Sequence, residues 1–152
     1  MRKELTHTYP VPLKKGFDYI DDFKMWPDWY VGMASIVKPE EGAWMEPGDE
    51  VRFIYKLLGR RVEGVAILEH RKVGELVKFR TEVPGLPTVH FEYHYAEAGS
   101  ESFVVRVAME TEEPTSFFGK AIDRALLPTV LARDLQRSLE NLEDIFAAGL
   151  LE

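Results

Sequence analysis

The sequence predicts an α+β protein in which a curved antiparallel sheet of six to seven strands wraps around one long C-terminal helix. Two patterns predict this fold class. Apolar residues recur three or four positions apart over residues 115–148, as on one face of an amphipathic helix. Most of residues 34–110 instead alternate with a period of two, as in half-buried strands. The long helix is the element that can cover the apolar face of such a sheet.

Length and composition restrict the function classes. A chain of 152 residues is expected to form a single domain over residues 1–152, with a substantial core. The net charge of −7 argues against a nucleic-acid partner and against attraction to an anionic membrane. The absence of cysteine excludes disulfides and thiolate chemistry. No apolar run has the length of a signal peptide or a membrane span, so we expect a cytoplasmic protein without membrane insertion. The sequence carries no signal of an oligomeric state.

The first forty residues predict a strand and two short helices. Alternation over Lys3–Val11 indicates an opening strand. Lys14–Phe23 is expected to be a short helix that turns Phe17 and Ile20 inward. A second short helical segment is expected at Pro27–Gly32, because proline suits the first turn of a helix.

The middle of the chain predicts a meander of alternating strands. A short strand at Ala34–Lys38 is followed by longer ones, whose inward rows we expect to be Val51 to Leu57, Val62 to Leu68, Val77 to Val83, Val89 to Tyr95 and Phe103 to Met109, each taken at every second residue. Turns are expected at Gly59, Val73–Gly74, Pro84–Pro87 and Ala98–Ser100. Alternate turns of a meander lie at the same end, so the first and third should share one rim with the entry to the last helix.

The last quarter, Thr115–Ala148, predicts the long helix. Gly149 suits the left-handed position just past a helix end. Pro128 falls inside the pattern, where it lacks an N–H and should cause a kink. Asp134 and Arg137 are expected to form an exposed ion pair on its outer face.

The interior of the predicted sheet favours a hollow core. Tyr55, Tyr93 and Tyr95 lie in the inward rows, and a buried tyrosine hydroxyl needs a partner. Gly64 and Ala66 are small residues at the centre of the inward face and should leave space. These features favour a mainly apolar pocket with a few polar groups. The alternative is a solid core whose tyrosine hydroxyls reach solvent.

Two short motifs resemble a known family. Asp22-Phe23-Lys24-Met25-Trp26-Pro27-Asp28-Trp29 is similar to the short-helix motif of the START-like superfamily, within its polyketide cyclase/dehydrase and lipid-transport group. Gly48-Asp49-Glu50-Val51 before the first long strand is also similar to members of that group. The resemblance covers roughly residues 3–148 and implies the helix-grip fold, with a cavity between helix and sheet for a hydrophobic or aromatic molecule. The fold does not fix the activity.

The resemblance and the inward rows together give a set of candidate ligand-binding residues. They are Phe53, Tyr55, Ala66, Phe79, Thr81, Leu86, Phe91, Tyr93, Tyr95, Phe118, Ile122 and Leu126. The resemblance further implies that loops at one rim gate the cavity. Here Val83–Thr88, with Leu86 at its centre, is the candidate gate; the alternative is an ordinary tight turn built from turn-prone residues.

Candidates for chemistry are few. His90, Glu92 and His94 project to one face of a strand, where a metal site is geometrically possible, but that face also carries Lys78 and Arg80, so we expect a solvated charge ladder. No catalytic triad, phosphate loop or dinucleotide fingerprint is recognisable. We therefore expect no metal and no cofactor.

Two functions from different classes follow. The first is binding of a lipid-like, quinone-like or polyketide-like molecule, and the alternative is a polyketide cyclase or dehydratase in which His7, Tyr55 or Tyr93 moves protons. A structural role for His7 is the alternative to proton transfer. Trp26 and Trp29 are expected to fix the short helices to the sheet rather than line the pocket. A weaker hypothesis is a protein partner that binds an exposed patch at Trp44-Met45.

Overall fold

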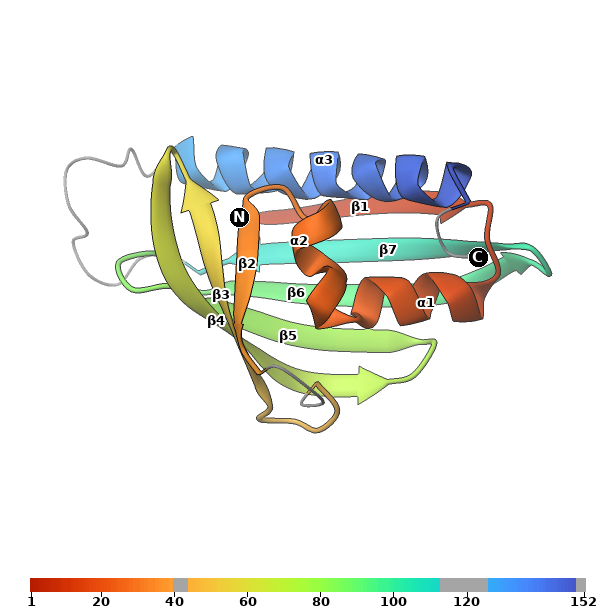
Figure 1. The fold of residues 1–152 in the computed structure, drawn as a ribbon, viewed down its shortest axis with the longest axis horizontal. Coiled ribbons are helices and arrows are strands. Elements are labelled where there is room, and N and C mark those ends of the chain that lie inside the picture. Colours follow the sequence, from red (N-terminus) through yellow and green to blue (C-terminus); the bar gives the residue numbers. More distant parts are fainter. Residues whose placement is uncertain (40–43, 113–125, 150–152) are drawn as a thin grey trace.

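The computed structural model describes residues 1–39, 44–112 and 126–149 (Figure 1). The described strands form one antiparallel sheet in the order β1-β7-β6-β5-β4-β3-β2. These strands are β1 (Arg2–Tyr9), β2 (Met33–Lys38), β3 (Glu50–Leu57), β4 (Arg60–Lys72), β5 (Leu76–Glu82), β6 (Val89–Gly99) and β7 (Ser102–Thr111). The helices are α1 (Leu13–Asp21), α2 (Trp26–Trp29), which follows the 3₁₀ turn η1 (Phe23–Met25), and α3 (Leu126–Ala147). The predicted fold class is confirmed.

Alternation along the strands determines which residues face the interior. Phe53 pairs with Gly64 across β3 and β4, and Phe79 pairs with Phe91 across β5 and β6, so their side chains share the inner face. The opposite face is charged, as the 2.9 Å ion pair between Lys78 and Glu92 illustrates. A slip of one residue would exchange the two faces, so this pattern specifies the register.

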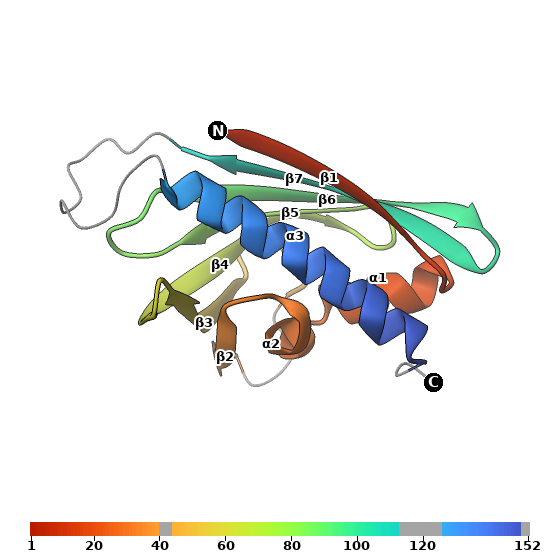
Figure 2. The same cartoon turned by 90° about the horizontal axis from the view of Figure 1, so that it is seen from above.

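The sheet twists strongly around the helices. In Figure 1, β2, β3 and β4 run steeply across the view, whereas β1, β7, β6 and β5 run along it below α3. Figure 2 shows α3 crossing over the sheet on the same side as α1 and α2. The predicted apolar stripe of α3 is buried at Leu135, Leu139 and Leu142. The Tyr9 hydroxyl donates a 2.7 Å hydrogen bond to the Leu139 carbonyl and ties β1 to α3.

Local sequence explains the two motifs that precede the long strands. The Asp22 side chain accepts a hydrogen bond from the Lys24 N–H, which caps η1, and Pro27 occupies the first turn of α2. The Asp49 carboxylate accepts from the N–H groups of Met45 and Glu46 and closes the turn before β3. Both motifs therefore hold turns that lead into the sheet.

The long helix is described only from Leu126 onward. The predicted part at residues 115–125 lies outside the described residues, and Pro128 stands in the first described turn, so the expected kink falls at this boundary. At the other end α3 is followed by Gly149 with a φ of +69°, the left-handed conformation expected there.

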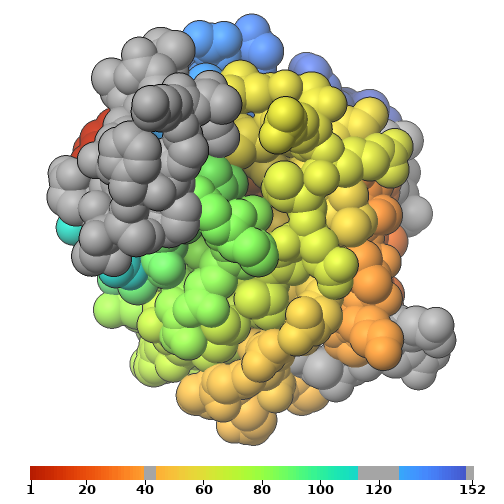
Figure 3. Space-filling view, turned by 90° about the vertical axis from the view of Figure 1, so that its left-hand side faces the viewer, coloured from red at the N-terminus to blue at the C-terminus, as the bar shows by residue number. Residues whose placement is uncertain are grey.

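The loops between strands define one end of the molecule. The β3–β4 turn and the β5–β6 loop lie at the same end, because alternate connections of a meander do. Figure 3 shows this end, with the β3–β4 hairpin in yellow and the β5–β6 loop in green. The predicted common rim is confirmed for these two connections.

Candidate functional site

A cavity lies between the inner face of the sheet and the helices. It contains about 820 Å³ of space between atoms, which includes solvent at its mouth, and about 90 Å³ of this admits the centres of water-sized molecules. That inner space has room for several waters. Its lining comes from strands β3 to β7, from the segment of α1 to β2, from Trp44 and Val83 in the loops, and from Leu131 of α3. The core is therefore hollow, and the solid-core alternative is wrong.

Most of the predicted ligand-binding residues line this cavity. Those that do are Phe53, Tyr55, Ala66, Phe79, Thr81, Phe91, Tyr93 and Tyr95. Leu86 does not: it packs against the hydrophobic core, and its loop reaches the cavity through Val83 instead. Phe118 and Ile122 lie outside the described residues, as does the side chain of Leu126. The alternation of the strands thus identified one wall of the cavity.

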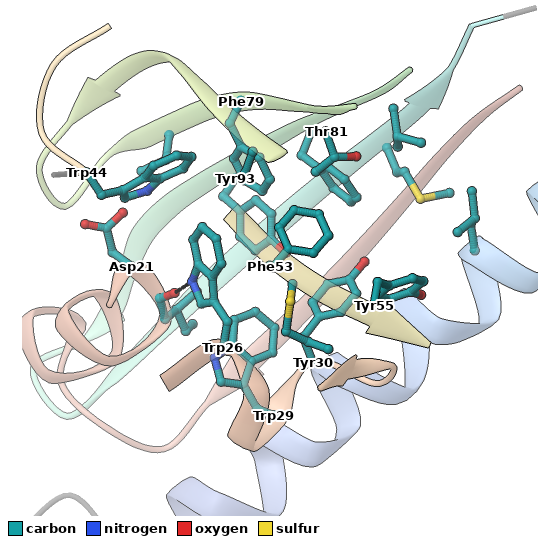
Figure 4. Close-up of a pocket in the computed structure, with 18 of the residues that line it drawn as sticks. Asp21, Trp26, Trp29, Tyr30, Trp44, Phe53, Tyr55, Phe79, Thr81 and Tyr93 are labelled. Atoms are coloured by element: carbon teal, nitrogen blue, oxygen red, sulfur yellow. Dashed lines mark hydrogen bonds between the residues drawn. The ribbon is translucent and has the colours of Figure 1, made fainter. Parts of the chain in front are cut away.

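Aromatic rings form a continuous wall (Figure 4). Trp26 stacks on Phe79 with centroids 6.0 Å apart, and Phe79 stacks on Phe91 at 5.0 Å. Trp44 meets Trp26 at 5.2 Å and Phe79 at 5.5 Å, edge to face in both cases. Offset and edge-to-face pairs are the favoured arrangements of aromatic rings, so this wall is stable without a ligand.

The tryptophans correct two sequence-based interpretations. Trp26 and Trp29 both line the cavity, although Trp26 also fixes its segment by donating a 3.0 Å hydrogen bond from Nε1 to the Ile20 carbonyl. Trp44 is only 4% exposed and lines the cavity, whereas Met45 is 62% exposed. The predicted Trp44-Met45 surface patch is therefore wrong, because only one of its two side chains is on the surface.

The space expected above Gly64 is already filled. A Cβ at Gly64 would lie 2.8 Å from Phe53 Cζ and 2.8 Å from Val83 Cγ2. Glycine is needed there so that the Phe53 ring can pack closely against β4. Ala66, two residues after Gly64 and on the same face of β4, does line the cavity. Of the two small residues, only Ala66 contributes room for a ligand.

A tyrosine–aspartate pair joins β3 to α3 beside the cavity. The Tyr55 hydroxyl donates a 2.5 Å hydrogen bond to Asp134 Oδ2. Burial raises the pKa of Asp134, although the hydrogen bond from Tyr55 acts in the opposite direction. Burial, reinforced by Asp134, raises the pKa of Tyr55, so its hydroxyl stays protonated. The exposed ion pair predicted between Asp134 and Arg137 does not form.

Further tyrosine hydroxyls remain without a partner among the described residues. Tyr30, Tyr93 and Tyr95 line the cavity, whereas the tyrosine hydroxyls that hydrogen-bond to another described residue are those of Tyr9 and Tyr55. Burial is the main reason why the pKa of each is raised. The cavity wall therefore offers neutral hydroxyl groups that can donate to or accept from a bound molecule.

The predicted histidine candidates lie elsewhere. His7 is half-buried on β1, stacks on Tyr9 with centroids 5.9 Å apart, and is not part of the cavity lining. On the outer face Glu92 pairs with Lys78, and His90 lies 2.6 Å from Glu112, which confirms the charge ladder. No group of three potential metal ligands occurs among the described residues.

Comparison with known proteins identifies the family. Residues 2–147 match the family model described as polyketide cyclase/dehydrase and lipid transport. The chain belongs to this family. The search of curated proteins found no match. No helix in the described ranges combines the length and hydropathy required to cross a membrane.

Solved structures share the fold of this polyketide cyclase/dehydrase and lipid-transport family member. A START superfamily protein from Mycobacterium smegmatis is 10% identical with a TM-score of 0.77, over 97% of each chain. The Zhui aromatase/cyclase from Streptomyces sp. R1128 is 16% identical with a TM-score of 0.75, over 95% of this chain and 92% of that one. TTHA0849 from Thermus thermophilus is 16% identical with a TM-score of 0.74, over 98% of this chain and 99% of that one.

Sequence reasoning missed the second wall of the cavity in this family member. Val77 and Val89 lie in the predicted inward rows, so alternation could have included them. Tyr30, in the link between α2 and β2, and Met33, the first residue of β2, also line the cavity, and both precede the strand predicted at Ala34–Lys38. Asp21, the last residue of α1, lines it too, and nothing in the sequence distinguishes Asp21 from the neighbouring Asp22.

Proposed function

We propose that the protein binds a hydrophobic small molecule with an aromatic body in the cavity between the sheet and α3. The observation that supports this most is the continuous ring surface of Trp26, Phe79 and Phe91, with Trp44 at its edge. Flat rings offer a planar guest large contact areas. The family description, which names polyketide cyclases and lipid transport, agrees with a ligand of this class.

The physical driving force is the exchange of water for apolar contact. Water between these rings finds few hydrogen-bond partners, because the nearby polar groups are mainly isolated tyrosine hydroxyls. An aromatic guest would displace that water and gain about 25 cal/mol for each Å² of apolar surface removed from solvent. The tyrosine hydroxyls then favour guests whose polar atoms can form hydrogen bonds with them.

The binding proposal is tested by titration calorimetry with naphthalene as the smallest planar probe. We expect one molecule to bind per chain and Ala66→Leu to weaken binding about tenfold or more, because the added methyl groups occupy the cavity. Ala96→Leu, on the exposed end of β6, is the matched control and should bind as the wild type does. Naphthalene that fails to bind, or binds Ala66→Leu equally well, would contradict the proposal. Native mass spectrometry of protein purified from its own host would then identify the resident molecule.

The Tyr55–Asp134 pair favours a second candidate, a cyclase or dehydratase activity. Tyr55 lines the cavity, stays protonated, and is held by Asp134 at 2.5 Å. A phenol carries a single proton, so Tyr55 would have to turn its O–H from Asp134 to the carbonyl oxygen that becomes negative during cyclisation. Tyr55→Phe should then abolish turnover of a polyketone while calorimetry still shows binding. Equal turnover in wild type and variant would reject the role of Tyr55, and His7→Ala and Tyr93→Phe test the other candidates in the same assay.

A further inference from the structure

One end of the cavity contains a carboxylate that the proposed function does not yet use. Asp21 closes α1 and lines the cavity, and its side chain is only 9% exposed. In Figure 4 it lies beside Trp44 at one end of the row of rings, whereas Tyr55 lies at the other end. A carboxylate so deeply buried loses most of its hydration and needs partners within the protein or on a ligand.

One oxygen of Asp21 is fully engaged. Arg71, from the far end of β4, directs both Nε and Nη2 to Oδ2, at 2.9 Å each. The guanidinium carbon also lies 5.8 Å from the centroid of Phe17, so the arginine is held by an aromatic face as well. The pair is therefore a fixed, locally neutral unit whose polar contacts all converge on one of the two carboxylate oxygens.

The other oxygen, Oδ1, has no hydrogen bond to any described residue, although Asp21 lines the cavity. Burial still raises the pKa of Asp21 despite Arg71, which shows that the pair does not replace all of the lost hydration. The Tyr95 side chain, with its hydroxyl, lies in the same part of the cavity, because its ring meets Phe17 edge to face with centroids 4.9 Å apart and Phe17 is the ring over which Arg71 lies. That hydroxyl also lacks a described partner.

We propose that Asp21 Oδ1 and the Tyr95 hydroxyl form a recognition site for a hydroxyl group of the ligand, which donates to Asp21 and accepts from Tyr95. This inference rests on the proposed binding function and specifies its ligand class further. The ligand is a neutral aromatic alcohol or phenol whose hydroxyl lies at Asp21 and whose rings pack along Trp26 and Phe79.

The charge of the site selects a neutral hydroxyl over ionic groups. Arg71 already balances the charge of Asp21, so a ligand ammonium would leave an uncompensated positive charge in an apolar cavity. A ligand carboxylate would meet Asp21 Oδ1 and be repelled. A hydroxyl brings no net charge, and its hydrogen bond to a carboxylate is of the stronger, charge-assisted kind.

The experiment compares two probes that differ in one hydrogen-bond donor. 2-Naphthol can donate a hydrogen bond, whereas 2-methoxynaphthalene keeps the ring and the oxygen but cannot donate. Calorimetry on the full chain should show 2-naphthol binding about tenfold more tightly or better, the effect of one hydrogen bond to a charged group. Naphthalene separates this donor effect from the extra bulk of the methyl group, and it should bind about as weakly as 2-methoxynaphthalene.

Variants then identify the residues that bind the hydroxyl of 2-naphthol. Asp21→Asn and Tyr95→Phe should each reduce the preference for 2-naphthol over 2-methoxynaphthalene by about tenfold. Asp18→Asn is the matched control, since Asp18 lies on the same helix but is exposed and pairs with Lys14. Tyr95→Phe removes a hydroxyl without a described partner, so it keeps the test available if Asp21→Asn does not fold.

The outcomes separate the two proposals. If none of the three probes binds, the proposed function itself fails. If all three bind with equal affinity, the cavity binds aromatic molecules but the hydroxyl site is overturned. A preference for 2-naphthol that survives in Asp21→Asn and Tyr95→Phe but disappears in Tyr55→Phe would also overturn it, because the donor would then lie at the other end of the cavity.

Discussion

Hydrogen-bond partners, more than burial, distinguish the tyrosines of this core. Tyr9 is fully buried and its hydroxyl is bonded to the Leu139 carbonyl at 2.7 Å. Tyr93 is almost as deeply buried, but its hydroxyl has no described partner and its side chain lines the cavity. The first hydroxyl therefore stabilises the fold, and the second is available to a ligand.

We predict that Tyr9→Phe lowers the free energy of unfolding by about 1 kcal/mol, because it removes one net hydrogen bond within the protein. Tyr93→Phe removes a hydroxyl without a described partner and should change stability by less than about 0.5 kcal/mol. Urea denaturation of both variants measures the difference. Equal losses would show that the two hydroxyls do not differ in this way.

Asp134 makes the stability of the protein depend on pH. Its pKa is raised in the folded state, mainly by burial, so the folded chain binds the proton more tightly than the unfolded chain. The contribution to stability is therefore complete below the ordinary aspartate pKa and is lost as the pH rises through the raised value. Asp134→Asn should gain stability relative to the wild type across that window, by less than about 1 kcal/mol, since solvent screens this half-exposed group.

Urea denaturation between about pH 3.5 and pH 7.5, a range that brackets the ordinary and the raised pKa, checks this prediction. Asp144→Asn is the control, because Asp144 is an exposed aspartate of the same helix. A stability difference that is the same at every pH would show that burial of Asp134 has no effect on its protonation.

Among single residues, the sequence predicts some members of the site and misses others for a physical reason. Phe79, Phe91 and Tyr93 follow from the period of two, because the sheet has only two faces. Asp21 and Asp134 do not, because a charged residue near a helix surface is usually solvated. Only the tertiary structure brings Arg71 to the first and Tyr55 to the second.

Helix α3 joins the rest of the fold through an apolar stripe and a polar one. Asp134, Ser138 and Asn141 lie on one face of the helix at spacings of four and three residues. Asp134 accepts from Tyr55, Ser138 Oγ accepts from the Val31 N–H at 2.8 Å, and Asn141 Nδ2 donates to the Trp29 carbonyl at 3.1 Å. This stripe holds the link between α2 and β2, which carries the cavity-lining residue Tyr30.

We predict that Ser138→Ala destabilises the protein by about 1–3 kcal/mol, because the Val31 N–H loses its acceptor. Hydrogen exchange at the Val31 amide should become faster by a larger factor than exchange at the amides of β2. Gln136→Ala, an exposed position of α3, is the control. Unchanged exchange at Val31 would show that this contact does not hold the link.

For the molecule as a whole, pairing between the first strand and the last makes β1 the edge of the sheet beside β7. β1 pairs with β7 from Arg2 opposite Glu110 to Tyr9 opposite Phe103. These partners are about a hundred residues apart in the chain, so the pair forms only after a large loop has closed. Without β1 the buried strand β7 would become an exposed edge.

We predict that a chain lacking residues 1–10 loses the cooperative unfolding transition or aggregates, because it loses Tyr9 and exposes β7. Thermal unfolding followed by circular dichroism, together with size-exclusion chromatography, measures this outcome. A truncated chain that remains monomeric with an unchanged melting temperature would show that β1 is dispensable.

For the whole molecule, the order of helices and strands was predictable because the apolar residues of each segment recur with the period of a helix or of a strand. The strand rows, the short helices and the buried stripe Leu135, Leu139 and Leu142 all agree with it. The detailed shape of the cavity was not predictable, since it depends on how one segment covers another. Gly64 illustrates this, because the space beside it is filled by the ring of Phe53, the residue that pairs with Gly64 across β3 and β4.

The chain has three tryptophans, and Trp26, Trp29 and Trp44 all line the cavity. The intrinsic emission of the protein therefore originates from this one location. A guest among the rings would quench or shift that emission without any attached dye, so occupancy can be followed optically in a stopped-flow mixer with the unlabelled chain.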